Sequence, residues 1–161
     1  MRNHRGLISC SLLCLAISSG GCASASRRHA DSLAAAEHTA FAYTHALYTG
    51  HIAEAERFVV PHYRSAFAAI TVSLGPHSLS ATHLRVGDVR LSHDDAVAVM
   101  EGTLCSTATK YSIAQSRAAG FGVSCRRNDN PTSADPGFSV RLQREAKQWF
   151  VTFLLQPQSG A

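Results

Sequence analysis

The sequence predicts an α+β fold, in which N-terminal helices pack on a curved antiparallel sheet of about four strands. Apolar residues recur at three- and four-residue steps from residue 32 to about residue 74, which is helical spacing. From about residue 83, apolar and polar residues alternate instead, as they do in strands. Helices followed by strands within a chain of 161 residues form the pattern of a single α+β domain.

The N-terminus has the features of an export signal. Arg2 and Arg5 precede an apolar run over residues 6–17, which is about 12 residues long. A membrane-spanning helix needs about 20 apolar residues, whereas a short apolar run after basic residues is typical of a secretory signal peptide. We therefore expect residues 1–21 to be a signal peptide and the rest of the chain to be exported.

Two processing sites overlap in the stretch SSGGCASAS, residues 18–26. Gly20-Gly21-Cys22 resembles the end of a bacterial lipobox, although Ser19 stands where lipoproteins usually have an aliphatic residue. This interpretation predicts lipidation of Cys22, a tether over residues 22–31 and a lipid-anchored protein of the cell envelope. Ala23-Ser24-Ala25 is instead an ordinary signal-peptidase site, which would release a soluble secreted protein after Ala25. We favour lipidation because Cys22 lies where the apolar run ends.

The charge balance gives no indication of a nucleic-acid partner. The chain has 15 basic and 11 acidic residues, and without Arg2 and Arg5 the basic count falls to 13. The remaining basic residues are scattered, apart from the pairs Arg27-Arg28 and Arg126-Arg127. Scattered charges of both signs are typical of a solvated surface.

Two of the five cysteines remain in the folded part under either cleavage, namely Cys105 and Cys125. An even number in an oxidising compartment predicts a disulfide, which would contribute roughly 3 kcal/mol for a loop of this length. The alternative is a pair of reduced, buried thiols. No C-x-x-C motif is present, so a zinc site is not indicated.

Three helices are expected in the first half of the domain. The first follows Asp31 or Ser32 as N-cap and ends at Gly50, and its apolar positions include Leu33, Ala36, Ala40, Tyr43 and Leu47. A short second helix covers residues 51–60. Pro61 then begins a third helix, which carries an apolar face and ends before Gly75-Pro76.

Strands are expected over residues 83–92, 96–105, 137–145 and 149–156. The first of them changes phase near Gly87, which predicts a β-bulge there, and Asp94-Asp95 predicts the turn that follows. Short strands over residues 110–113 and 121–126 would form an extended hairpin. Residues 126–137 have the composition of a loop.

Three segments carry a resemblance to a known family: AFAYTHALYTGHIAEAERFVVP, VGDVRLSHDDAVAVMEGTL and FSVRLQREAKQWFVTFLL. Their order, with a helix, a glycine turn, a short helix and paired strands, is similar to that of the nuclear transport factor 2-like (cystatin-like) superfamily. Small secreted or lipid-anchored bacterial members are the most similar. The resemblance covers residues 32–156, and it implies a sheet that wraps the first helix around a cone-shaped cavity.

The resemblance also implies where a ligand or substrate would lie, because isomerases and dehydratases of this superfamily work inside the cone. The candidate pocket residues are Tyr43, Phe41, Phe67, Asp88 and Trp149. Asp88 is the carboxylate with apolar strand neighbours, and an apolar pocket can raise the pKa of such a group. No catalytic pattern of the superfamily matches residue by residue, and a bulge or rim position is the alternative for Asp88.

Metal chemistry is not indicated by the histidines. His38 and His45 share a helix face, but seven residues correspond to a rise of about 10.5 Å, which is too far for joint ligation. We therefore expect a non-catalytic, lipid-anchored envelope protein without a metal or cofactor, which binds a small apolar ligand or a protein partner. The alternatives are a soluble secreted enzyme with its site in the cone, of the isomerase or dehydratase type, and a scaffold in a cell-surface complex.

Overall fold

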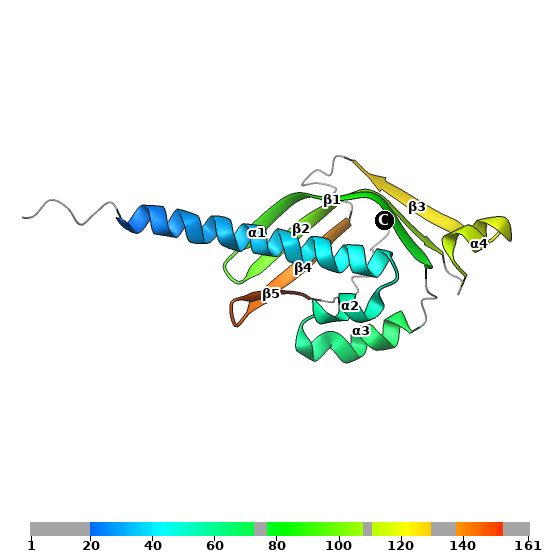
Figure 1. The fold of residues 1–161 in the computed structure, drawn as a ribbon, viewed down its shortest axis with the longest axis horizontal. Helices are drawn as coiled ribbons and strands as arrows, with labels where there is room; N and C mark the ends of the chain where they lie inside the picture. The colour runs from blue at the N-terminus through cyan, green and yellow to red at the C-terminus, as the bar shows by residue number, and fades with distance from the viewer. Residues whose placement is uncertain (1–19, 73–76, 108–110, 130–137, 153–161) are drawn as a thin grey trace, which may run out of the picture.

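The computed structural model describes residues 20–72, 77–107, 111–129 and 138–152. A long helix lies across one face of an antiparallel sheet, and two shorter helices and a 3₁₀ turn pack beside its C-terminal end (Figure 1). The predicted α+β class, with N-terminal helices on an antiparallel sheet, is confirmed. The sheet has five strands, where the sequence predicted about four.

The long helix α1 spans Gly20–Tyr48, so it begins well before the expected cap at Asp31 or Ser32. Residues 23–31 are rich in alanine and arginine and contain no proline, so nothing in them stops a helix that already exists at Ala36. Residues 25–31 are exposed, and this part of α1 projects beyond the sheet (Figure 1). The expected tether over residues 22–31 is therefore helical. Gly50, with a φ of +84°, follows α1 as predicted.

The next helices agree with the sequence prediction. They are α2 (Ile52–Arg57), the 3₁₀ turn η1 (Pro61–Tyr63) and α3 (Arg64–Thr71). Pro61 lies in the first turn of η1, where its missing N–H costs no helical hydrogen bond. Val59 also pairs with Val151, which joins this region to the last described strand.

The sheet is built around its second strand. The strands are β1 (Leu79–Ser92), β2 (Asp95–Thr107), β3 (Val123–Asn128), β4 (Phe138–Glu145) and β5 (Gln148–Val151). β1 pairs with one side of β2, while β4 and β3 pair with the first and second halves of its other side. β5 pairs with β4, and among the described strands none pairs with the outer side of β1.

The β1–β2 hairpin turns at His93-Asp94, one residue before the expected Asp94-Asp95, because Ser92 already pairs with Asp95. The register shifts between Val86 and Asp88, so the bulge predicted at Gly87 is confirmed. A second shift, between Thr82 and Arg85, was not predicted.

The region between β2 and β4 differs most from the prediction. Residues 113–118 form a helix, α4 (Ile113–Ala118), and residues 111 and 112 before it are not in a strand, so the strand expected over residues 110–113 is not present among the described residues. Ser112 caps α4, and the Gln115 side chain accepts a hydrogen bond from the Ser112 backbone N–H, so the two form a capping box. The S-x-x-Q pattern was therefore the decisive local signal. The strand expected over residues 121–126 is present as β3, whereas residues 108–110, 130–137 and 153–156 lie outside the described residues.

The core lies between α1 and the sheet. Ala36 and Ala40 have no exposed surface, and such small side chains let the helix approach the strands closely. The larger side chains that fill the space are Tyr43, Phe67, Met100, Leu142 and Trp149. Burial of these apolar surfaces is the main force that holds helix and sheet together.

Candidate functional site

Three of the five residues expected to line an apolar pocket fill the core instead. Tyr43, Phe67 and Trp149 are 5%, 0% and 5% exposed. The rings of Tyr43 and Phe67 are in tilted contact, with their centroids 6.2 Å apart. These side chains therefore occupy the space in which the cone-shaped cavity was expected.

The other two candidate residues lie at the surface. About half of the Asp88 side chain is exposed, and its Oδ2 accepts a hydrogen bond from Arg90 Nε at 2.9 Å. Asp88 is thus part of a surface ion pair beside the bulge, which was the alternative position for this residue. Phe41 is 38% exposed and stacks on His45, with ring centroids 5.7 Å apart. The five residues are therefore divided between core and surface.

Burial affects two tyrosines on the core side of α1. It raises the pKa of Tyr43 well above its ordinary value, and the neighbouring Tyr48 adds to this effect. Burial likewise raises the pKa of Tyr48. Both hydroxyls therefore remain protonated at neutral pH, and neither is prepared to act as a base.

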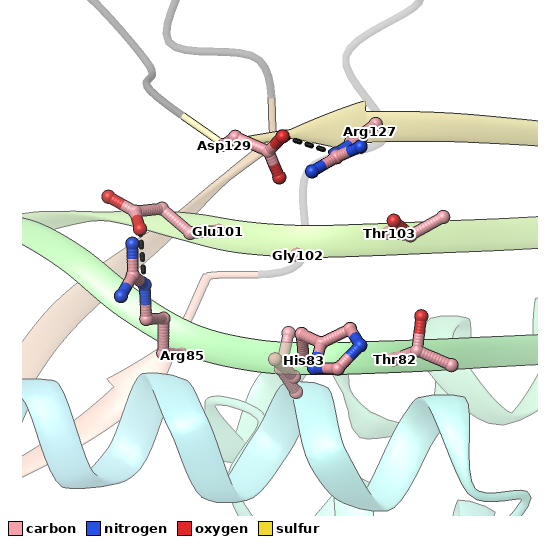
Figure 2. Close-up of a pocket in the computed structure, with 9 residues that line it drawn as sticks. Thr82, His83, Arg85, Glu101, Gly102, Thr103, Arg127 and Asp129 are labelled. Atoms are coloured by element: carbon pink, nitrogen blue, oxygen red, sulfur yellow. Dashed lines mark hydrogen bonds and ion pairs between the residues drawn. The ribbon is translucent and has the colours of Figure 1, made fainter.

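A polar cavity of about 790 Å³ lies along β1, β2 and β3 (Figure 2). This volume is in the range of small-molecule sites, which is about 300–1,000 Å³. We call it the strand cavity, and its lining residues are Thr82, His83, Leu84, Arg85, Glu101, Gly102, Thr103, Arg127 and Asp129.

An irregularity in β1 shapes this cavity. Thr82 pairs with Thr103 and Arg85 with Glu101, so two residues of β1 lie opposite Gly102 alone. One of them, His83, has a φ of +56°, which is rare for a residue with a side chain. Backbone outliers of this kind concentrate at binding and catalytic sites, where the surrounding structure maintains them.

Glycine is required opposite this bulge. Gly102 has a φ of +128°, and a Cβ atom there would lie 2.8 Å from the Thr82 carbonyl oxygen and 2.9 Å from that of His83. The bulge of β1 therefore depends on the absence of a side chain in β2. Glycine inside a strand is a known sign of a bulge or of a close backbone approach.

Glu101 is the most buried charged group of the strand cavity. Its side chain is 14% exposed and its Oε2 lies 2.5 Å from Arg85 Nε, while the Arg85 side chain is 71% exposed. Gly87 gives the carboxylate its space, because a Cβ atom at residue 87 would overlap it. The absence of a side chain at Gly87 therefore leaves space for the carboxylate that pairs with the Arg85 guanidinium.

The opposite side of the strand cavity carries a second ion pair, between Arg127 and Asp129 (Figure 2). Both side chains are more than half exposed, so this pair is weak and its partners can exchange with a ligand. The two arginines and the two carboxylates of the lining balance each other in charge. The cavity therefore has groups that can bind both the positive and the negative charges of a ligand.

An apolar groove of about 400 Å³ lies between α1 and β1. We call it the helix groove, and its lining residues are Ala34, Glu37, His38, Phe41, Arg85 and Val86. Arg85 lines both the groove and the strand cavity. The exposed ring of Phe41 therefore lines a groove beside the edge strand β1.

The predicted disulfide between Cys105 and Cys125 is present. The two residues are directly opposite in the β2–β3 ladder, with their Cα atoms 4.0 Å apart. Arg117 Nη2 lies 3.5 Å from Cys125 Sγ. Because Arg127 follows in the same ladder, the disulfide also fixes one wall of the strand cavity.

The lipidation site falls at the N-terminal end of the described chain. The backbone of Cys22 belongs to α1, but its side chain lies outside the described residues, so lipidation stays a prediction. In the described part of the chain, no helix combines the length and the apolar character that a membrane span requires. Within the same residues, no group of three or more His, Cys, Asp or Glu side chains has the arrangement of a metal site.

Sequence reasoning did not find the strand cavity. Its charged residues, Arg85, Glu101 and Arg127, come from three different strands, and no sequence spacing relates them. The available signal was Gly102 in the middle of an otherwise β-forming segment, which indicates a bulge on the neighbouring strand.

Comparisons with known proteins place the chain in no group. No family model, no curated protein and no solved structure matches it.

Proposed function

We propose that this chain is an exported, lipid-anchored binding protein whose ligand site is the strand cavity. The observation that carries the proposal is the pairing of a bulged β1 with Gly102, which opens a cavity lined by charged and hydroxyl-bearing side chains. A ligand site of this kind needs a few converging polar groups on rigid elements. The disulfide supplies rigidity on the β3 side.

The recognition chemistry of the strand cavity is polar. The interior between α1 and the sheet is filled by Tyr43, Phe67 and Trp149, which argues against a small apolar ligand at the centre of a cone. In the strand cavity, each arginine already contacts a carboxylate, and such groups recognise a ligand by charge and hydrogen bonding.

The runner-up function, a soluble secreted isomerase or dehydratase, has less support. It would place an acid or base inside an apolar cone, yet Asp88 is half exposed and paired with Arg90. Membership of the nuclear transport factor 2-like superfamily remains a proposal. It draws on the order of helices and antiparallel strands, which is compatible with that superfamily.

Native mass spectrometry of protein isolated from its own host tests the ligand site. We expect a bound small molecule in the wild type and its loss in the double variant Glu101→Gln/Arg127→Gln. The matched control is Asp88→Asn/Arg90→Gln, which removes an exposed ion pair outside the cavity and should retain the ligand. Equal occupancy in both variants, or no ligand in the wild type, would contradict the proposal.

Fractionation of the host cells tests the anchor. The wild type is expected in the membrane fraction, and Cys22→Ser should release it, because lipidation requires the thiol. Retention of the Cys22→Ser protein on membranes would overturn the lipid anchor, and a wild type found in the soluble fraction would instead indicate cleavage after Ala25.

A further inference from the structure

We propose that the strand cavity and the helix groove form one continuous site for a single-chain amphiphile with a zwitterionic phosphate head, of the lysophospholipid type. This inference rests on the proposed function and names its ligand class. The head would occupy the strand cavity and the acyl chain would lie along the helix groove.

Arg85 connects the two halves of the site. It lines both the cavity and the groove, and its exposed guanidinium is held by Glu101. The next residue, Val86, lines the groove and not the cavity, and Glu37 and His38 add polar groups to the groove lining. The cavity and the groove thus meet at Arg85 in β1, and no described strand pairs with the outer side of β1.

The charges of the cavity favour a zwitterionic head over an anionic one. Arg127 is 76% exposed and can exchange its weak contact with Asp129 for a phosphate, which arginine binds well. Asp129 is then available to an ammonium group, while Glu101 stays paired with Arg85. A purely anionic head would leave Asp129 without a cationic partner and would be repelled by it.

The groove supplies the surface for an acyl chain. Phe41 is one of the few large apolar side chains with substantial exposure, and it lies beside Ala34 and Val86. Each methylene that leaves water for such a surface strengthens binding by up to about fourfold. Affinity should therefore depend on chain length until the groove is filled.

Isothermal titration with lysophosphatidylethanolamines of increasing acyl length, all below their critical micelle concentrations, tests the chain. For the oxidised full-length domain, we expect the affinity to rise by up to about fourfold per added methylene. Phe41→Ser should flatten this dependence. Val72→Ser, which alters a side chain that is 85% exposed and outside the groove, should preserve it. Melting curves verify that both variants fold.

The head is tested with the same proteins and two further probes, glycerophosphoethanolamine without an acyl chain and lysophosphatidylglycerol with an anionic head. Glu101→Gln and Arg127→Gln should weaken binding of the zwitterionic series by about tenfold at every length, and the wild type should bind the anionic lipid about tenfold more weakly. Equal binding of both heads would overturn the inference.

The outcomes separate this inference from the proposed function. The inference of an amphiphilic ligand is wrong if the chain-free head binds as tightly as the longest lipid, or if Phe41→Ser leaves the length dependence unchanged. In either case, the proposal of a polar ligand site in the strand cavity is not affected. If no probe binds, the amphiphile is also wrong, while the native mass spectra of the isolated protein still decide the proposed function.

Discussion

Two single residues make the strand cavity possible, and both are glycines. Gly87 leaves space for the Glu101 carboxylate, and Gly102 accepts the close approach of the Thr82 and His83 carbonyls. Neither glycine belongs to a loop. Because both lie inside paired strands, their role is to leave space for neighbouring atoms and not to make the chain flexible.

Gly102→Ala should destabilise the protein by about 1–3 kcal/mol, because its φ of +128° and two carbonyl contacts exclude a Cβ atom. Urea unfolding measures the change. Gly122→Ala is the matched control, since a Cβ atom at residue 122 would have no neighbour within 4 Å, and it should change stability by less than about 0.5 kcal/mol. Equal effects of the two substitutions would show that the bulge does not depend on Gly102.

The buried Tyr43 predicts a loss of stability at alkaline pH. The unfolded chain releases the tyrosine proton near pH 10, whereas burial raises the pKa of Tyr43 in the folded protein above that value. Above about pH 10 the unfolded state therefore binds fewer protons, and the free energy of unfolding falls by up to about 1.4 kcal/mol per pH unit. Below that pH, this residue contributes no pH dependence.

Tyr43→Phe should reduce this alkaline slope without changing stability much at neutral pH. The measurement is urea unfolding at several pH values from neutral to strongly alkaline. Tyr111→Phe is the control, because Tyr111 is 52% exposed. An identical slope in wild type and Tyr43→Phe would contradict the burial of this hydroxyl.

Among the elements, the β2–β3 ladder depends on its disulfide. Cys105→Ala/Cys125→Ala should lower the free energy of unfolding by roughly 3 kcal/mol, since the cross-link closes a loop with a sequence separation of 20. Chemical unfolding with and without a reductant tests this. The wild type should respond to the reductant and the double variant should not. A wild type that is equally stable after complete reduction would contradict the prediction.

Substitutions in the turn of the β4–β5 hairpin should make the protein more stable. Its turn residues Ala146 and Lys147 have φ values of +47° and +72°, which Asn-Gly adopts more readily. Ala146→Asn/Lys147→Gly should therefore stabilise the protein by about 0.5–2 kcal/mol in thermal unfolding. Lys147→Gln, which keeps a side chain at the strained position, should be close to neutral. A decrease for the double variant would mean that the turn is of another type.

Local sequence signals predicted some elements and missed others for identifiable reasons. The helices around Ala36 and Phe67 and the bulge at Gly87 were evident, because periodicity and glycine report them directly. The capping box that begins at Ser112 was not recognised, so weak alternation led to a predicted strand over residues 110–113 and α4 was not predicted. The N-terminal extension of α1 was missed because its polar residues show no apolar face, although their helix propensity permits it.

For the whole molecule, the sequence indicated the fold class. The resemblance implied a cone-shaped cavity, and in the structure Tyr43, Phe67 and Trp149 are buried in the core between α1 and the sheet. Whether an interior is filled depends on side chains from several elements, and no single segment reports it. The strand cavity likewise combines Arg85, Glu101 and Arg127 through strand register, which a sequence pattern does not contain.

The central claim is that ligand binds along β1, β2 and β3 and not in the apolar core. Amide chemical-shift mapping of the ¹⁵N-labelled, oxidised protein during titration with a lipid extract from its host tests this most directly. We expect shifts concentrated at residues 82–86, 101–103 and 127–129, with a second group at residues 34–41 of α1. Shifts confined to the neighbours of Phe67 and Trp149 would contradict the claim, whereas no shifts at any lipid concentration would contradict the amphiphilic ligand.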